Sequence, residues 1–250
     1  MKKQGEAKEG AKRGRGRPRG ATEQGLETRQ HLYETSLRLI AARGFDETTL
    51  RDIAQEAGVS VGLLYRYFPS KRAIVLALYE ELSARYAEAA VKMGVGPWRE
   101  RFLFALRTSL EVLGPHREPL TALVPVLVGG KEEGLFSPGT AFSRLRVQGA
   151  FVDAALGATD APGGTTGPAL GRVLYMVHLA VVLWWLLDKS PRQRATDGLI
   201  RLLERLLLPA SLALKVPGAG AFVRTADALF RQGLLGEPAA PGDAGEEPAS

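Results

Sequence analysis

Apolar side chains recur at helical spacing along most of this chain, and no run of residues alternates with a period of two. Residues 28–44 are typical, because Leu32, Leu39 and Ile40 share one face and Gly44 can end the helix. Segments of the same kind cover 120–128, 141–156, 169–187 and 192–208, and a weak amphipathic helix is expected at 219–235. The sequence therefore predicts an all-α fold.

The formal net charge of +6 is concentrated at the N-terminus, where residues 1–20 hold eight Lys or Arg against two Glu. Residues 1–25 contain almost nothing to bury, so we expect a disordered basic arm that binds a polyanion, most commonly nucleic acid. The chain has no cysteine and no secretory pattern near its start. Its longest apolar run, 173–187, is too short to cross a bilayer as a helix. The expected location is the cytoplasm.

Residues 49–69 carry the pattern helix, glycine turn, short helix. Thr49 and Asp52 have capping-box spacing, and Gly58 follows the short helix that contains Ile53 and Ala54. Ser60 can cap the next helix, which Pro69 ends. This pattern indicates a helix-turn-helix, whose second helix is short enough to enter a DNA major groove.

Residues 28–82 resemble the DNA-binding domain of TetR-type bacterial transcriptional repressors. The resemblance lies in Gly44-Phe45, then Thr48-Thr49-Leu50, Ile53-Ala54 and Ala57-Gly58-Val59-Ser60, and then the run from Gly62 to Lys71, GLLYRYFPSK. It implies a three-helix DNA-binding domain, expected over 26–92, and a larger helical ligand-binding and dimerisation domain, expected over 93–215. The residue pattern and composition of 216–250 predict a weak helix and a disordered tail.

The same resemblance implies roles for individual residues. It assigns Thr49 and Lys71 to phosphates, Tyr65 and Tyr67 to the sugar-phosphate backbone, Val61, Gly62 and Leu63 to base edges, and Arg51 to a further DNA contact. Leu63 stands where the family usually has threonine, so thymine methyl groups and DNA shape are expected to carry more of the specificity. Arg72 replaces an acidic residue common in the family.

The basic arm contains Arg15-Gly16-Arg17-Pro18 followed by Arg19, which resembles the core of an AT-hook. Glycine and proline keep such a backbone narrow, so Arg15, Arg17 and Arg19 can enter an A·T minor groove. The alternative is a basic tail that only keeps the protein soluble.

The C-terminal half indicates a dimer with a ligand pocket. In the resembling family the last two long helices form a four-helix bundle with a second subunit, and 169–187 and 192–208 suit that role. Residues with aromatic rings or polar tips on apolar helices are candidate ligand contacts: Trp98, Phe102, Phe142, Phe151, Tyr175, His178 and Trp185. They can equally fill the core. His178, a lone imidazole in an apolar run, needs a hydrogen-bonding partner in either case.

These observations predict a dimeric DNA-binding regulator, a repressor released from a pseudo-palindromic operator by a small, largely apolar ligand. The alternative is an architectural DNA-binding protein that takes no ligand. An enzyme is disfavoured, because the three histidines lack active-site partners at helical spacing and no glycine-rich phosphate loop follows a strand. We expect neither a metal nor a cofactor.

Overall fold

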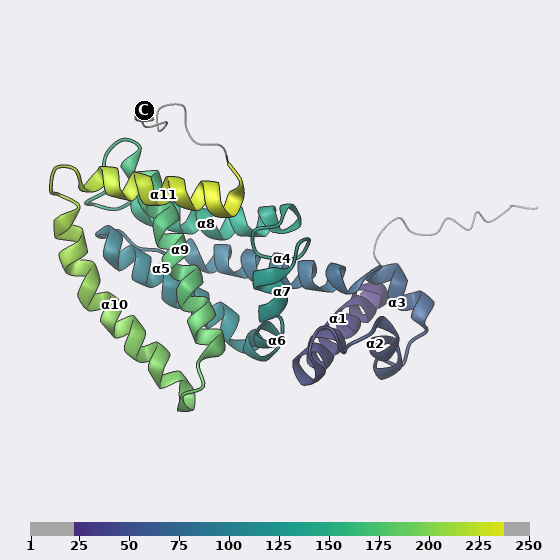
Figure 1. Ribbon diagram of the computed structural model, residues 1–250. Helices are drawn as coiled ribbons and strands as arrows, with labels where there is room; N and C mark the ends of the chain where they lie inside the picture. The colour runs from purple at the N-terminus through teal and green to yellow at the C-terminus, as the bar shows by residue number, and fades with distance from the viewer. Residues whose placement is uncertain (1–22, 238–250) are drawn as a thin grey trace, which may run out of the picture.

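The computed structural model describes residues 23–237, and every regular element in that range is a helix (Figure 1). This confirms the predicted all-α fold. The end predicted to bind DNA, called the DNA-binding end below, consists of α1 (Glu23–Arg43), α2 (Leu50–Glu56) and α3 (Val61–Tyr67), and α4 (Lys71–Ala90) leads from it into the rest of the molecule. The candidate arm residues Arg15, Arg17 and Arg19 lie outside the described residues.

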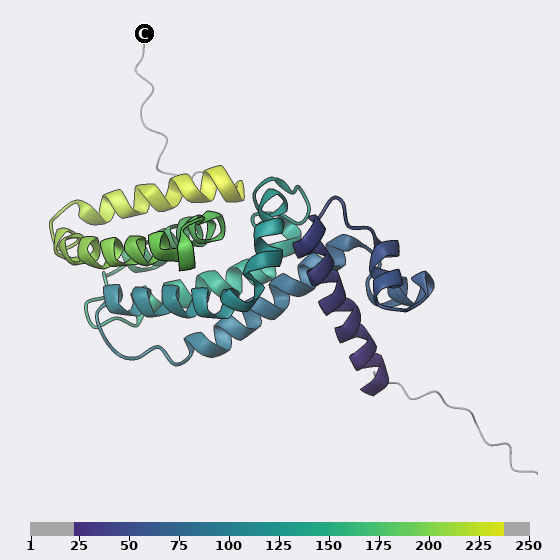
Figure 2. The ribbon, with the colours of Figure 1, turned by 90° about the horizontal axis from the view of Figure 1, so that it is seen from below.

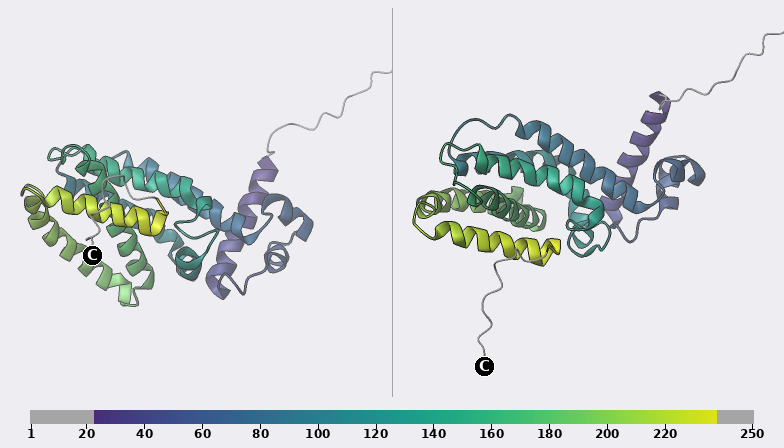
Figure 3. Two further views of the ribbon diagram at one scale, coloured as in Figure 1. Left: turned by 45° about the horizontal axis from the view of Figure 1, so that its top comes forward. Right: turned by 90° about the horizontal axis from the view of Figure 1, so that it is seen from above.

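The larger part of the chain forms a layered helical body. It comprises α5 (Trp98–Leu113), α6 (Arg117–Ala122), α7 (Val124–Gly129), α8 (Ala141–Leu156), α9 (Thr166–Leu187), α10 (Arg194–Ala213) and α11 (Ala219–Leu235), with short 3-10 turns at Gly114–His116, Pro138–Thr140 and Pro191–Gln193. Figure 2 shows α9 and α10 as a layer between α11 on one side and α5 and α8 on the other. Both views in Figure 3 place α1–α3 at the end opposite α10.

Several helix boundaries differ from the prediction. The apolar segment 120–128 is broken at Leu123 into α6 and α7, because Pro125 in the first turn of α7 has no N–H to continue the preceding helix. Helix α1 begins at Glu23, inside the segment predicted to be disordered, and α10 continues past Pro209.

The helix that contains 173–187 is longer than predicted, so the prediction that it is too short to cross a bilayer is wrong for the helix as a whole. Helix α9 begins at Thr166, and its 22 residues are long and apolar enough to cross a bilayer by length and composition. In the fold it packs against α8 and α11, and Leu170, Leu174 and Val181 are buried there. Packing inside the body buries 44% of its most apolar stretch and so accounts for part of the apolar length of α9.

Two clusters of buried side chains form the core. One joins the DNA-binding end to the body, since Leu32 and Ile40 of α1 belong to the same cluster as Leu120 of α6 and Leu186 of α9. The other fills the body around α5, α8 and α9. Helix α1 packs directly on α6, and α6 in turn packs on α9.

Candidate DNA-binding surface and ligand cavity

Helix α2 begins with a complete capping box. The Asp52 backbone N–H donates to Thr49 Oγ1 over 3.1 Å, and the Thr49 backbone N–H donates to Asp52 Oδ2 over 2.9 Å. The hydrogen bonds from Thr49 favour the charged carboxylate and hold the pKa of Asp52 below its usual range. The short helix therefore has a fixed start next to the candidate phosphate contact at Thr49.

The turn between α2 and α3 has the geometry that the sequence predicts. Gly58 adopts a left-handed φ of +67°, which reverses the chain and which glycine takes without strain. The Val59 N–H then donates to the Ala54 carbonyl over 3.0 Å, and Ser60 Oγ accepts the Leu63 N–H over 3.2 Å. Ala54 is fully buried, so α3 crosses α2 closely.

The outer face of α3 is open to solvent. Val61, Gly62 and Tyr65 are exposed, while Leu64 on the opposite side is buried in the core. Leu63 is partly buried at the edge of this face. The structure therefore brings the predicted base and backbone contacts together on one surface, at the N-terminal end of a helix whose N–H groups favour an anion.

Arg66 was missed by the sequence analysis. It lies one helical turn after Gly62, is exposed, and makes no ion pair with any described residue. The sequence contained a signal for Arg66, because residues four positions apart share one face of a helix. Arg66 is therefore on the same face as Gly62 and not on the face of Leu64. Arg66 adds a positive charge to the exposed face of α3.

The remaining candidate DNA contacts flank this face. Thr49 and Arg51 are exposed and Tyr67 is partly buried. Lys71 Nζ donates to the Phe45 carbonyl over 2.6 Å and lies 4.4 Å from the centre of the Phe45 ring. Lys71 therefore ties the start of α4 to the loop after α1, in addition to its predicted role at a phosphate. Direct DNA contact by these residues stays a prediction.

Four of the seven candidate ligand residues meet in one aromatic cluster in the body. The ring centres of Phe151 and His178 are 4.6 Å apart, those of Tyr175 and His178 are 5.9 Å apart, and Phe102 lies 6.0 Å from Phe151. Tyr86 of α4, which the sequence analysis did not select, stacks on both Phe151 and His178. The cluster connects α4, α5, α8 and α9.

The other three candidates lie elsewhere. Trp98 is buried at the start of α5, and its backbone N–H donates to Asp160 Oδ1 over 2.7 Å. Phe142 is exposed on α8 beneath the guanidinium of Arg146. Trp185 is buried near the end of α9, where the Arg117 guanidinium carbon lies 5.6 Å from its ring centre.

A cavity of about 440 Å³ opens beside the aromatic cluster, and its volume is in the range of pockets that bind small molecules. Tyr175 and His178 are the two candidate ligand residues that line it. The remainder of its wall is mostly apolar and comes chiefly from α4, α5, α7, α8 and α9.

The imidazole of His178 is buried in this wall, and one of its two nitrogens has the partner that the sequence predicts, while Nδ1 has none among the described residues. His178 Nε2 lies 2.8 Å from Ser109 Oγ. Burial without a nearby carboxylate lowers the pKa of His178 to about 3. The imidazole is therefore neutral at physiological pH.

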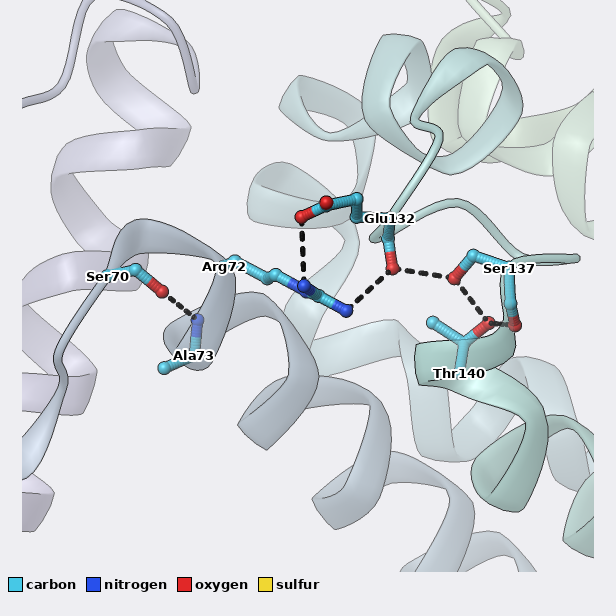
Figure 4. A network of polar contacts seen from close by, with 6 residues as sticks. All are labelled: Ser70, Arg72, Ala73, Glu132, Ser137 and Thr140. Carbon is cyan, nitrogen blue, oxygen red and sulfur yellow. Dashed lines mark hydrogen bonds and ion pairs between the residues drawn. The ribbon is translucent and has the colours of Figure 1, made fainter.

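A chain of polar contacts runs from the cavity wall to the first turn of α4 (Figure 4). Thr140, which lines the cavity, lies 3.3 Å from Ser137 through their hydroxyl oxygens, and Ser137 Oγ donates to the Glu132 carbonyl over 2.7 Å. Glu132 Oε2 accepts from Arg72 Nη1 over 2.8 Å, and Ser70 caps the same turn by accepting the Ala73 N–H. Arg72, the departure from the family pattern, is thus a link between the cavity and the helix that follows α3.

Comparisons with known proteins agree on the family. The family profile described as "Bacterial regulatory proteins, tetR family" matches residues 32–78, which run from α1 into α4. An uncharacterised HTH-type transcriptional regulator, YerO of Bacillus subtilis, is 43% identical over 54 residues, but the match covers only 22% of this chain and 19% of the relative.

Longer matches extend into the helical body. The HTH-type transcriptional repressor KstR of Mycolicibacterium smegmatis is 28% identical over 180 residues, which cover 68% of this chain and 81% of KstR. The crystal structure of a tetR-family transcriptional regulator from Streptomyces coelicolor superposes with a TM-score of 0.57 and 27% identity, covering 82% of this chain and 91% of that one.

Proposed function

Because this chain belongs to the TetR family of bacterial transcriptional regulators, we propose that it is a dimeric repressor that leaves a palindromic operator when a small, largely apolar ligand fills the cavity. The observation that carries the proposal is the polar path from Thr140 through Glu132 to Arg72. It connects the wall of a ligand-sized cavity to the turn that follows the recognition helix.

The DNA-binding step rests on the exposed face of α3. Val61, Gly62 and Leu63 would lie at base edges, with Tyr65, Tyr67, Thr49, Arg51 and Lys71 at the DNA backbone. One short helix reads few base pairs, so a two-fold dimer that reads two half-sites, with its recognition helices roughly 34–36 Å apart or a multiple of that, is the arrangement we propose.

The apolar surface that α9 and α10 expose supports dimerisation through these helices. Trp184 and Leu187 on α9 are 49% and 54% exposed, and Leu202 and Leu206 on α10 are 51% and 53% exposed. Large apolar side chains exposed on two successive helices are typical of an interaction site. The same pair of helices from a second copy would cover it as a four-helix bundle.

Release by a ligand follows from the position of the path between cavity and DNA. A molecule that enters the cavity contacts Thr140 and the neighbouring residues of the loop between α7 and α8. A shift of Glu132 would then change the position of Arg72 and of the first turn of α4. Lys71, the adjacent residue, would lose its alignment with a phosphate.

DNA retention in the presence of small molecules tests the proposal. The full chain is bound to the intergenic DNA beside its own gene, and the small-molecule fraction of a cell extract is added. We expect release of wild-type protein from the DNA. Glu132→Gln, which breaks the ion pair but keeps the positive charge of Arg72, is expected to bind DNA and to need more extract for release.

Glu88→Gln is the matched control, since Glu88 is an exposed residue of α4 without an ion pair to any described residue. It should behave like wild type. Equal release of Glu132→Gln and wild type would contradict the proposed path. A DNA complex that no extract affects would instead support the alternative of an architectural DNA-binding protein.

We propose that the protein works in the cytoplasm, where its DNA is, and that it binds its effector without converting it chemically. Among residues 23–237 no group of three or more His, Asp or Glu side chains is placed to hold a metal ion. Turnover of a compound that releases the protein from DNA would reopen the enzymatic role.

A further inference from the structure

One charged side chain, Arg144 of α8, lines the cavity. Its Nη1 donates to the Leu135 carbonyl over 3.3 Å, a long contact that leaves the other guanidinium nitrogens available. Its Nε is buried without a hydrogen-bond partner, and no carboxylate of the described residues lies within ion-pair distance. A partly buried guanidinium in this state is stabilised by an anion that supplies the missing acceptors.

Tyr175 supplies a second donor in the same wall. Its side chain lines the cavity, and its hydroxyl makes no hydrogen bond to the described part of the protein. Arg144 and Tyr175 line the same cavity, and burial raises the pKa of Tyr175 more than the positive charge of Arg144 lowers it. The phenol therefore stays protonated and can donate a hydrogen bond to an anion bound at Arg144.

The rest of the wall does not favour a cation. Within residues 23–237 no aspartate or glutamate lines the cavity, and the carboxylate of Glu80 near its edge is already 2.9 Å from Arg146 Nη1. Glu133, whose charge acts on Tyr79, is not a lining residue either. The remaining surface is dominated by apolar side chains of α9 and α5, including Val182, Leu186 and Val112.

We propose that the cavity binds an amphipathic carboxylate, with its carboxylate group on Arg144 and Tyr175 and its apolar part along α9 and α5. That this carboxylate is the effector rests on the proposed function. That the cavity binds such a carboxylate rests on the two hydrogen-bond donors and on the apolar wall.

Calorimetric titration of the full chain with three probes tests the inference. Dodecanoate, dodecanol and dodecylamine share one alkyl chain and differ in their head groups, and each is used below its micelle concentration. We expect dodecanoate to bind at least about tenfold more tightly than dodecanol, because a hydrogen bond to a charged group is worth about 1.5–3 kcal/mol. Dodecylamine should bind more weakly than both.

Variants locate the head group. Arg144→Met should weaken dodecanoate binding about tenfold to a hundredfold and leave dodecanol binding nearly unchanged. Arg144→Lys, which keeps the charge, should retain part of the preference, and Tyr175→Phe should reduce it while preserving the buried ring. Arg146→Met is the matched control, because Arg146 lies on the same helix but is paired with Glu80 and does not line the cavity. Circular dichroism confirms that each variant is folded.

The outcomes separate this inference from the proposed function. Equal affinity for dodecanoate and dodecanol, or equal loss of dodecanoate binding in Arg144→Met and Arg146→Met, would overturn the inference. Arg144-dependent binding of dodecanoate that leaves the DNA complex intact would support this site and contradict its role in release. Release from DNA by an extract from which organic acids have been removed would show that the effector is not a carboxylate. That result would overturn this inference and would not contradict the proposed function.

Discussion

At the scale of single residues, His178 has a pH dependence that can be measured. Burial lowers its pKa from 6.5 to about 3, so the unfolded chain binds a proton that the folded chain excludes as the pH falls below 6.5. The stability that depends on the neutral imidazole is complete above that pH and is lost progressively towards the folded pKa. Lowering the pH from about 7.5 to about 5.5 should reduce the free energy of unfolding by about 1 kcal/mol because of His178.

Urea denaturation at the two pH values measures this effect. His178→Asn should be less stable than wild type at both pH values. Its free energy of unfolding should change less between the two pH values than that of wild type, because the titrating imidazole is gone. His116, whose pKa burial also lowers, remains present in both proteins and cancels in the comparison. Parallel pH profiles of the variant and wild type would contradict the assignment of a neutral buried imidazole.

Leu63 offers a second test at this scale. It lies at the edge of the exposed face of α3 and has no polar group to read a base. If it packs on a thymine methyl group, Leu63→Ala should change the base preference at one position by about 1–3 kcal/mol. Competition binding over a randomised half-site measures the preference, and Tyr67→Ala should weaken all sequences alike because a backbone contact reads no base. An unchanged profile for Leu63→Ala would remove this residue from recognition.

The sequence identifies the need of His178 for a partner but not the partner itself. Ser109 lies 69 positions away on another helix, and no local pattern relates the two residues. The same holds for Glu132, which is 60 positions from Arg72. Local rules predict caps and turns, as at Thr49 and Gly58, whereas contacts between distant helices depend on how the helices pack.

At the scale of helices, Arg117 fastens the end of α9 to α6. Its Nε and Nη2 donate to the Trp185 carbonyl over 3.2 and 3.0 Å, and Nη2 also donates to the Asp188 carbonyl over 2.8 Å. At the C-terminal end of α9 the Trp185 carbonyl accepts only a long bond, 3.4 Å, from the Asp188 backbone N–H, and a positive charge there is favourable. Because α6 packs on α1, the end of α9 is held against the DNA-binding end.

Arg117→Ala is therefore expected to lower the free energy of unfolding by about 2 kcal/mol, since several hydrogen bonds from a partly buried charged donor are lost. Urea denaturation monitored by circular dichroism measures the change. Arg38→Ala is the control, because Arg38 forms an exposed ion pair with Glu56 and should cost about 0.5 kcal/mol. An equal decrease in the free energy of unfolding in the two variants would contradict the proposal that Arg117 stabilises the packing of α6 against the end of α9.

The spacing of apolar residues predicted which segments are helical better than it predicted where the helices begin and end. The segments 141–156 and 219–235 are helices with the predicted bounds, and glycine lies directly after both of them and directly before the second. Helix α9 extends beyond its predicted start, and α10 continues through Pro209, where packing of Leu207 and Ser211 outweighs the missing N–H. Tertiary contacts therefore decide the ends that local signals leave open.

At the scale of the whole molecule, the basic arm can be tested apart from the fold. Helix α1 begins at Glu23, so deletion of residues 1–20 leaves every described helix intact. If the arm arginines enter a minor groove, DNA affinity should fall and the log–log salt dependence should become shallower by about 0.9 for each phosphate neutralised. The loss should be larger beside A·T tracts than beside G·C-rich DNA.

Gel-shift titrations over a range of salt concentrations measure both quantities. Replacement of the arm arginines by lysines is the control, because it keeps the charge but not the shape that suits a narrow groove. Equal losses on both flanking sequences would mean a tether without sequence preference. An unchanged salt slope would mean that the arm does not touch DNA.

The three tryptophans lie in environments that give the protein an internal optical reporter. Trp98 is 3% exposed and Trp185 is 6% exposed, whereas Trp184 on α9 is 49% exposed. Water-exposed indoles emit at longer wavelength than buried ones, so in a separated subunit the red component of the intrinsic fluorescence belongs to Trp184. If α9 lies in the dimer interface, dilution that separates the subunits should shift the emission to the red and increase quenching by iodide. Trp184→Phe should abolish both changes, so assembly of the regulator can be followed without any attached dye.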